Sequence, residues 1–243
     1  MNQSISTVTS KDGNTKSAPD VLIFDVNETL IDFEVMNPLF ERVFGDKRFL
    51  REWLGQLIMY SMTLTLSGQY KDYFSIGKGC LEMVARVHGK KVSPDDIEAI
   101  KSSMETMPAH ADAREGLEML KKAGFRLVSL TNSPLLPEDK TPLAKAGLAD
   151  LFERQFSIES ARSYKPAQVV YHMVPQELGV PESACCMVAT HMWDTIGAQS
   201  AGLYGALLTR PGNASLVIPG VPQPHIIAAD VPAMAREAAK LWR

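Results

Sequence analysis

The amino-acid sequence predicts an α/β fold in which a parallel sheet forms the core and inserted helices form a cap subdomain. Short apolar runs alternate with helical patterns from about residue 113 onward, which is typical of strand–helix–strand units in one parallel sheet. From about residue 34 to about residue 107 the sequence has helical spacing and few strand signals. One predicted strand precedes that stretch, so the helices interrupt the core as a cap over its edge.

The first predicted strand, Val21–Phe24, consists of four apolar residues in a row, as in a strand covered on both faces of a parallel sheet. Asp25 ends this run, and a polar turn follows. Ligands of open α/β sheets bind just beyond the carboxyl ends of the strands, so Asp25 stands where chemistry is expected. Taken alone, Asp25 is better explained as the N-cap of the next helix. Its assignment therefore depends on the other strand ends.

Residues 34–107 are predicted to form the helical cap. Its helices are predicted at Met36–Phe44, Phe49–Leu66, Gln69–His88 and Pro94–Glu105. Glycines separate these segments, as helix terminators do, and Ser93 with Pro94 marks a helix start. Residues 20–33 and 108–243 are predicted to form the core. Residues 1–19 are rich in Ser, Thr, Lys and Asn, which predicts a disordered tail.

Strands and helices alternate in the rest of the core. Strands are predicted at Phe125–Leu130, Gln155–Ile158, Cys185–Val188 and Tyr204–Thr209. Helices are predicted at Ala113–Ala123, Pro142–Ala146, Ala167–Leu178, Thr195–Ala201 and Val231–Leu241. The alternation implies right-handed crossovers.

Composition and charge exclude several classes of partner. The 243 residues are 45% hydrophobic and 22% charged, which is ordinary for a globular protein. The net charge of −3 gives no basic footprint for nucleic acid or an anionic membrane. No apolar stretch approaches the ~18 residues that cross a bilayer. Three cysteines are too few for a disulfide framework, and no signal-peptide pattern is present, so we expect a cytoplasmic protein.

Polar side chains follow three of the predicted strands. They are Asp25 with Thr29, Thr131 with Asn132, and His191 with Asp194. A lone Lys165 precedes a helix between the second and third clusters. Because loops at the carboxyl ends of parallel strands converge at one edge, the four groups are expected to share a pocket. A solvated lysine and a turn asparagine would explain single members, but not their combination.

These motifs resemble those of the haloacid dehalogenase superfamily. The similarity covers nearly all of Val21–Arg210 and rests on Asp25-Val26-Asn27-Glu28-Thr29, Thr131-Asn132, Lys165-Pro166 and Asp194. Ser163-Tyr164-Lys165-Pro166, Tyr171 and Trp193-Asp194 resemble the type II, L-2-haloacid dehalogenase branch. The resemblance implies a Rossmann-like core, a homodimer and a small-molecule haloacid substrate, with no metal or other cofactor.

The resemblance also implies a reaction, the hydrolytic dehalogenation of short 2-haloalkanoic acids. Asp25 would attack the substrate α-carbon, displace halide and form an ester that water then hydrolyses. Lys165 would keep Asp25 ionised, since a nearby cation favours the charged form. Asp194, with His191, would position or activate the water. A structural role for His191 is almost equally well supported.

The remaining candidates would hold the nucleophile or the substrate. Thr29 would shape the turn after Asp25, and Tyr171 would support the lysine or the substrate. Thr131 and Asn132 would orient the nucleophile or bind the substrate carboxylate.

The cap departs from the branch at one position. The branch has an arginine directly after a cap tryptophan, where it receives the halide. Matching Trp53 to that tryptophan places Leu54 at the arginine position, while Arg48 and Arg51 lie on the other side of Trp53. Trp53 and Leu54 are candidate substrate contacts, although a tryptophan on such a helix more often serves packing.

Two alternatives stay open. A Mg²⁺-dependent phosphatase of the same superfamily is disfavoured, because Asn27 stands where its second aspartate would be and Thr190 replaces the first of its two final acids. A binding protein with a degraded site is the second alternative, since fold does not fix function. Against it, Asp25, Lys165 and Asp194 are all present.

Overall fold

The structure, a computed structural model, describes residues 18–243. The disordered tail predicted for residues 1–19 therefore lies outside the described residues, apart from its last two positions. The described chain contains a six-stranded sheet in which each pair of neighbouring strands is parallel. The predicted α/β fold with a parallel sheet is confirmed.

The first strand lies in the middle of the sheet, whose order is β3-β2-β1-β4-β5-β6. The strands are β1 (Val21–Phe24), β2 (Arg126–Thr131), β3 (Arg154–Ser157), β4 (Cys185–Ala189), β5 (Tyr204–Leu208) and β6 (Ile226–Ala228). Every residue of β1 is fully buried, as expected for an apolar strand covered on both faces. Strand β6 was not predicted, because it has only three residues and its central Ile227 is 51% exposed.

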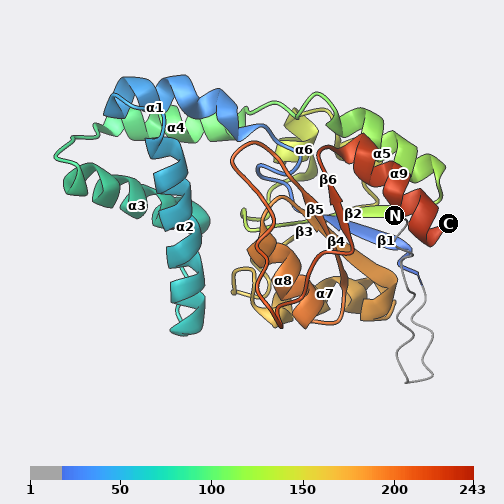
Figure 1. The fold of residues 1–243 in the computed structure, drawn as a ribbon. Coiled ribbons are helices and arrows are strands. Elements are labelled where there is room, and N and C mark those ends of the chain that lie inside the picture. Colours follow the sequence, from blue (N-terminus) through green and yellow to red (C-terminus); the bar gives the residue numbers. More distant parts are fainter. Residues whose placement is uncertain (1–17) are drawn as a thin grey trace, which may run out of the picture.

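Helices cover both faces of the sheet (Figure 1). They are α5 (Ala113–Lys122), α6 (Pro142–Lys145), α7 (Gln168–Leu178), α8 (Met192–Ser200) and α9 (Val231–Trp242). Helices α5 and α9 pack together on one face, and α7 and α8 pack together on the other. Gly116 permits the first of these contacts, because a Cβ there would lie 2.6 Å from the backbone of Val231. Helix α8 begins at Met192, three residues before its predicted start.

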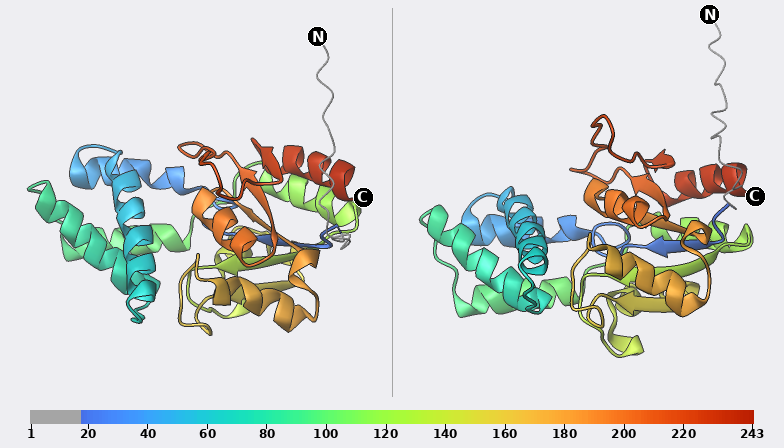
Figure 2. Two further views of the ribbon diagram at one scale, coloured as in Figure 1. Left: turned by 60° about the horizontal axis from the view of Figure 1, so that its bottom comes forward. Right: turned by 90° about the horizontal axis from the view of Figure 1, so that it is seen from below.

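Four helices between β1 and α5 form a separate group beside the sheet (Figures 1 and 2). They are α1 (Asn37–Phe44), α2 (Phe49–Leu66), α3 (Tyr73–Val87) and α4 (Pro94–Glu105). All four were predicted, but α3 starts later than expected, because the Asp72 side chain caps it by accepting from the Ser75 N–H (2.9 Å). Aromatic rings fill the group, with the centroids of Phe40 and Trp53 5.4 Å apart.

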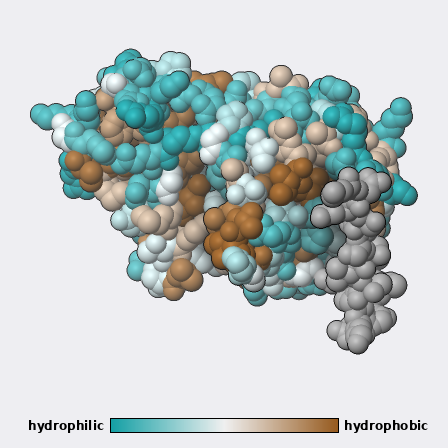
Figure 3. All heavy atoms as spheres, viewed as in Figure 1, coloured by the Kyte–Doolittle hydropathy of each residue, from teal (hydrophilic) through white to brown (hydrophobic). Residues whose placement is uncertain are grey.

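The division of the chain into a core and a cap at residues 34 and 107 stays a prediction. One continuous cluster of buried apolar side chains includes residues of both parts. On the face seen in Figure 3, hydrophobic residues lie in separate groups among hydrophilic ones. Within residues 18–243, none of the helices combines the length and the apolar character that a membrane span needs.

Candidate active site

The register of the sheet brings three strand ends together. Phe24, the last residue of β1, pairs with Ser129 in β2 and with Val188 in β4. The Asp25 N–H continues this ladder by donating to the Val188 carbonyl (2.9 Å). The loops after β1, β2 and β4 therefore open at the same edge of the sheet, and the side chains of Asp25, Asn132 and Asp194 follow these strands there.

The Asp25 carboxylate has one donor on each oxygen. Thr29 Oγ1 donates to Oδ2 (2.8 Å), and Lys165 Nζ donates to Oδ1 (2.9 Å). Thr29 Oγ1 also accepts from the Thr190 N–H (3.1 Å), which ties the turn after β1 to the loop after β4. Asp25 remains 8% exposed. Its carboxylate is thus held in one orientation and is still accessible, as a nucleophile requires.

The Lys165 side chain is fully buried between two carboxylates. Its Nζ donates to Asp25 and, over 2.7 Å, to Asp194 Oδ2. Its backbone N–H donates to Asn132 Oδ1 (3.2 Å). Burial on its own lowers the pKa of Lys165, but the carboxylates of Asp194 and Asp25 outweigh it and the pKa is raised overall. The two carboxylates therefore stabilise the charged form of Lys165 beside the candidate nucleophile.

Asp194 and Tyr171 lie on the far side of Lys165. Asp194 is fully buried in the first turn of α8, and Tyr171 Oη donates to its Oδ1 (2.7 Å). Burial raises the pKa of Asp194, while the Lys165 ammonium acts in the opposite direction. Burial also raises the pKa of Tyr171 well above its usual value, so the phenol keeps its proton and remains a donor. Gly197 makes room for this contact, because a Cβ there would lie 2.8 Å from the Tyr171 hydroxyl.

A second charged network at this edge was not predicted from the sequence. It centres on Glu28, which is 4% exposed and has a left-handed backbone with φ of 62°. His191 Nε2 donates to Glu28 Oε2 (2.7 Å), and Arg51 pairs with Glu28 Oε1. His110 Nε2 donates to the Glu28 carbonyl (3.0 Å) and so supports the unusual turn. The one signal for this network in the sequence is Glu28 itself, a charged residue in the buried turn after Asp25.

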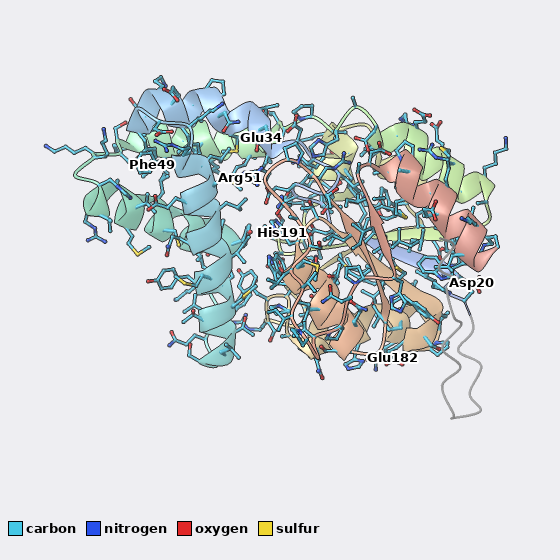
Figure 4. All side chains as sticks on the ribbon, in the orientation of Figure 1. Asp20, Glu34, Phe49, Arg51, Glu182 and His191 are labelled. Atoms are coloured by element: carbon cyan, nitrogen blue, oxygen red, sulfur yellow. The ribbon has the colours of Figure 1, made fainter. Side chains whose placement is uncertain are left out.

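Arg51 connects α2 to the sheet part of the molecule. Besides Glu28, its guanidinium pairs with Glu34 and donates to the Pro211 carbonyl (2.9 Å). Figure 4 shows Arg51, Glu34 and His191 at the boundary between α2 and the sheet. Burial on its own lowers the pKa of Arg51, but Glu28 and Glu34 outweigh it and the pKa is raised.

A small cavity, called here the reaction cavity, adjoins the Asp25 carboxylate. It is lined by Asp25, Asn27, Glu28, Leu54, Ile58, Tyr73, Asn132, His191 and Trp193. Its volume is about 20 Å³. Since a water molecule needs about 10–15 Å³ by this measure, the cavity has room for one water. Three predicted residues, Leu54, Asn132 and His191, thus face the same space as Asp25.

Two predicted site residues lie elsewhere. The Thr131 hydroxyl accepts from the Ser133 N–H (3.1 Å), and Thr131 lines a different cavity, between β2, β3 and α6. Trp53 is 2% exposed, and its Nε1 donates to the Gly77 carbonyl on α3 (2.8 Å). For Trp53 this favours the packing alternative over a substrate contact.

The donor set at the strand ends does not fit Mg²⁺. The Lys165 ammonium lies between the carboxylates of Asp25 and Asp194, and each of their four oxygens already accepts a hydrogen bond. The Asn27 amide donates to Ser133 Oγ (3.2 Å), and the Thr190 hydroxyl donates to the Leu208 carbonyl (2.8 Å). Among the described residues, no group of three or more His, Cys, Asp or Glu side chains is arranged to hold a metal ion.

Comparison with known proteins finds haloacid dehalogenases among the relatives. An (S)-2-haloacid dehalogenase 4A of Burkholderia cepacia is 28% identical over 194 residues, which cover 79% of this chain and 83% of that protein. An (S)-2-haloacid dehalogenase of Pseudomonas sp. (strain YL) is 25% identical over the same shares of the two chains.

Solved structures show the same fold. The L-2-haloacid dehalogenase of Xanthobacter autotrophicus with chloropropionic acid covalently bound superposes with a TM-score of 0.78 at 19% identity. The match covers 92% of this chain and 99% of that one. A family model described as "Hydrolase: haloacid dehalogenase-like hydrolase" matches residues 19–202, most of the sequence. The chain therefore belongs to the haloacid dehalogenase-like hydrolases.

Proposed function

We propose that the protein hydrolyses short 2-haloalkanoic acids to 2-hydroxy acids and halide, with Asp25 as the nucleophile. The observation that carries this proposal is the buried Lys165 ammonium between the carboxylates of Asp25 and Asp194. It supplies the fixed positive charge that an ionised, desolvated aspartate needs. The relatives named for (S)-2-haloacids and the structure that holds covalent chloropropionic acid support the same reaction.

In the first step an Asp25 carboxylate oxygen attacks the substrate α-carbon. The carbon–halogen bond breaks as the new carbon–oxygen bond forms, and the halide leaves with the bonding electron pair. Thr29 and Lys165 hold the two oxygens of the carboxylate and thereby limit its orientations. In the second step water attacks the aspartyl carbonyl carbon, which releases the 2-hydroxy acid and restores Asp25.

The second step needs a base for the attacking water. His191 faces the reaction cavity, and because its Nε2 donates to Glu28, its Nδ1 is the nitrogen that can accept a proton. Asp194 is a weaker candidate, since its two oxygens already accept from Lys165 and Tyr171 and its side chain is only 1% exposed. We therefore assign the base to His191 and the positioning of Lys165 to Asp194.

The leaving halide and the substrate carboxylate need donors on the cavity wall. Leu54 lines the cavity and offers none. The amide of Asn132 and the indole of Trp193 also line it, and an N–H of either group can donate to an anion. These two residues are our candidates for the role that an arginine at position 54 would have.

Halide release provides the test. Wild type and Asp25→Asn are compared with both enantiomers of 2-chloropropanoate and with haloacetates, in the presence of EDTA. We expect release by wild type only, and no effect of the chelator, since the proposal includes no metal or other cofactor. A single turnover in ¹⁸O-labelled water should place the label in the Asp25 peptide. Label found only in the hydroxy acid, or phosphate release that depends on Mg²⁺, would contradict the proposal.

Two further properties are proposed on narrower support. The described cysteines, Cys80, Cys185 and Cys186, are all free and buried, which supports a cytoplasmic location. Exposed apolar side chains on α2, among them Tyr60 and Leu66, support a homodimer through the cap. Sedimentation of wild type and Leu66→Glu tests the dimer, which the variant should weaken.

A further inference from the structure

A second and larger cavity lies between the cap and the sheet part. Its volume is about 220 Å³. Most of its lining is apolar: Phe74, Met104 and Met107 on the cap side, and Pro134, Leu136 and Pro142 on the core side. We call this space the tail cavity. It exceeds the ~150 Å³ that binds a benzene molecule in an apolar protein cavity.

The tail cavity adjoins the reaction cavity. Asn27 and Tyr73 line both, so these two side chains form the wall that the cavities share. Asn27 lies two residues after Asp25, and its amide donates to Ser133 Oγ, which lines the tail cavity. A group bound at the Asp25 carboxylate therefore has an apolar space directly beside it.

Three lysines and one glutamate line the tail cavity: Lys101, Lys140, Lys145 and Glu105. Lys145 Nζ lies 3.9 Å from Glu105 on the same lining, and Lys101 Nζ lies 3.8 Å from Glu98. Lys101 also sits 5.5 Å from the ring centroid of Phe74. The Lys101 and Lys145 side chains are 41% and 35% exposed, so their ammonium groups reach water and leave the apolar surface to a ligand.

We propose that the tail cavity binds the apolar substituent on C2 of the substrate. Resting on the proposed dehalogenation, this extends the substrates beyond the shortest acids to 2-haloacids with a linear chain of several carbons or a phenyl group, which should be preferred. The reaction cavity, with room for about one water, cannot contain such a substituent. The shortest haloacids leave the tail cavity filled with water and so gain nothing from it.

Binding of unhalogenated acids tests this proposal without any turnover. Calorimetry of the full chain with acetate, butanoate, hexanoate and 3-phenylpropanoate gives one dissociation constant for each acid. Each methylene transferred from water to an apolar site should tighten binding about fourfold. The affinity is expected to rise along the series, and equal affinities for acetate and hexanoate would overturn the proposal.

Variants of Leu136 locate the effect. Leu136 lies in a loop and is 37% exposed, so its replacement is compatible with folding. Leu136→Trp fills the cavity and Leu136→Asp adds a charge to it; both should remove most of the gain from acetate to hexanoate. The matched control is Leu216→Trp, which changes an exposed loop leucine that lines neither cavity. If both Leu136 variants kept the wild-type ratio of affinities, the tail would bind elsewhere and the proposal would be wrong.

Halide release from 2-bromo acids of the same lengths separates this proposal from the one it rests on. Chain-length-dependent binding without halide release from any acid would refute the dehalogenase function and leave the apolar site standing. Halide release from 2-bromopropanoate with no gain in kcat/KM for 2-bromohexanoate would refute the apolar site and leave the dehalogenase function standing.

Discussion

Replacing Lys165 by methionine gives the sharpest test of the buried charge cluster. The change keeps a long apolar side chain but removes the cation that, within residues 18–243, pairs with Asp25 and Asp194, at 2.9 and 2.7 Å. Removing one partner of a buried ion pair costs about 3–5 kcal/mol, because the remaining charge has no compensation. Since 1 kcal/mol shifts Tm by about 2–4 °C in a domain of this size, we expect Tm to fall by about 6–20 °C at neutral pH.

The direction in which this loss of stability changes with pH identifies its cause. In wild type the pKa of Lys165 is raised, so its stabilisation is complete below the pKa of the unfolded chain and is lost only as pH rises through the folded value. In Lys165→Met no ammonium compensates the buried carboxylates of Asp25 and Asp194. Their protonated forms are therefore favoured in the folded state. The stability deficit against wild type should therefore shrink as pH falls from 8 to 5.

Urea unfolding at pH 5, 6.5 and 8 measures this deficit, and halide release measures function. Lys240→Met, at an exposed lysine on α9, is the matched control and should change the free energy of unfolding by less than about 0.5 kcal/mol. The double variant Lys165→Met/Asp194→Asn should regain part of the stability and none of the activity. A deficit below 1 kcal/mol, or one that stays constant with pH, would refute the reasoning.

Three further predictions follow from single contacts. Tyr171→Phe removes the hydroxyl that donates to Asp194 and should cost about 1.5–3 kcal/mol in urea unfolding, with a fall in kcat larger than the change in KM. Glu28→Gln weakens the orientation of His191, so rapid-quench kinetics should show a burst of halide followed by slow turnover; loss of the burst itself would mean that Glu28 acts in the first step. Trp53→Phe removes a buried hydrogen bond within the cap and should lower Tm by a few degrees while kcat stays within about twofold, so a large loss of kcat would return Trp53 to the substrate site.

The sheet and the nucleophile cluster could be predicted because their signals are local. A run such as Val21–Phe24 is apolar on both faces, and the loops after parallel strands must meet at one edge. Lys165 and Asp194 were therefore expected near Asp25. The Lys165 ammonium, which donates to both carboxylates, agrees with that expectation. Strand β6 was not predicted, because three residues are too few to show a strand pattern in the sequence.

The network of Glu28, His191 and Arg51 could not be predicted in the same way. It depends on where α2 lies against the turn after β1, and that placement is set by packing between segments far apart in the sequence. The prediction of Thr131 as a site residue, in the loop after β2, failed for a related reason. Thr131 stands beside Asn132 in the sequence, but its hydroxyl accepts from Ser133 in the same turn and it lines another cavity.

The position of Arg51 also bears on how a substrate arrives. A reaction cavity of about 20 Å³ is too small for a haloacid, and Leu54 and Ile58 of α2 form part of its wall, so a movement of α2 away from the sheet would enlarge it. Such a movement must first release the Arg51 guanidinium from Glu28 and from the Pro211 carbonyl. These Arg51 contacts oppose the movement of α2. Salt weakens them, because the Arg51 side chain is 34% exposed. We therefore expect salt to favour the movement of α2 and to leave the fully buried ion pairs of Lys165 almost unaffected.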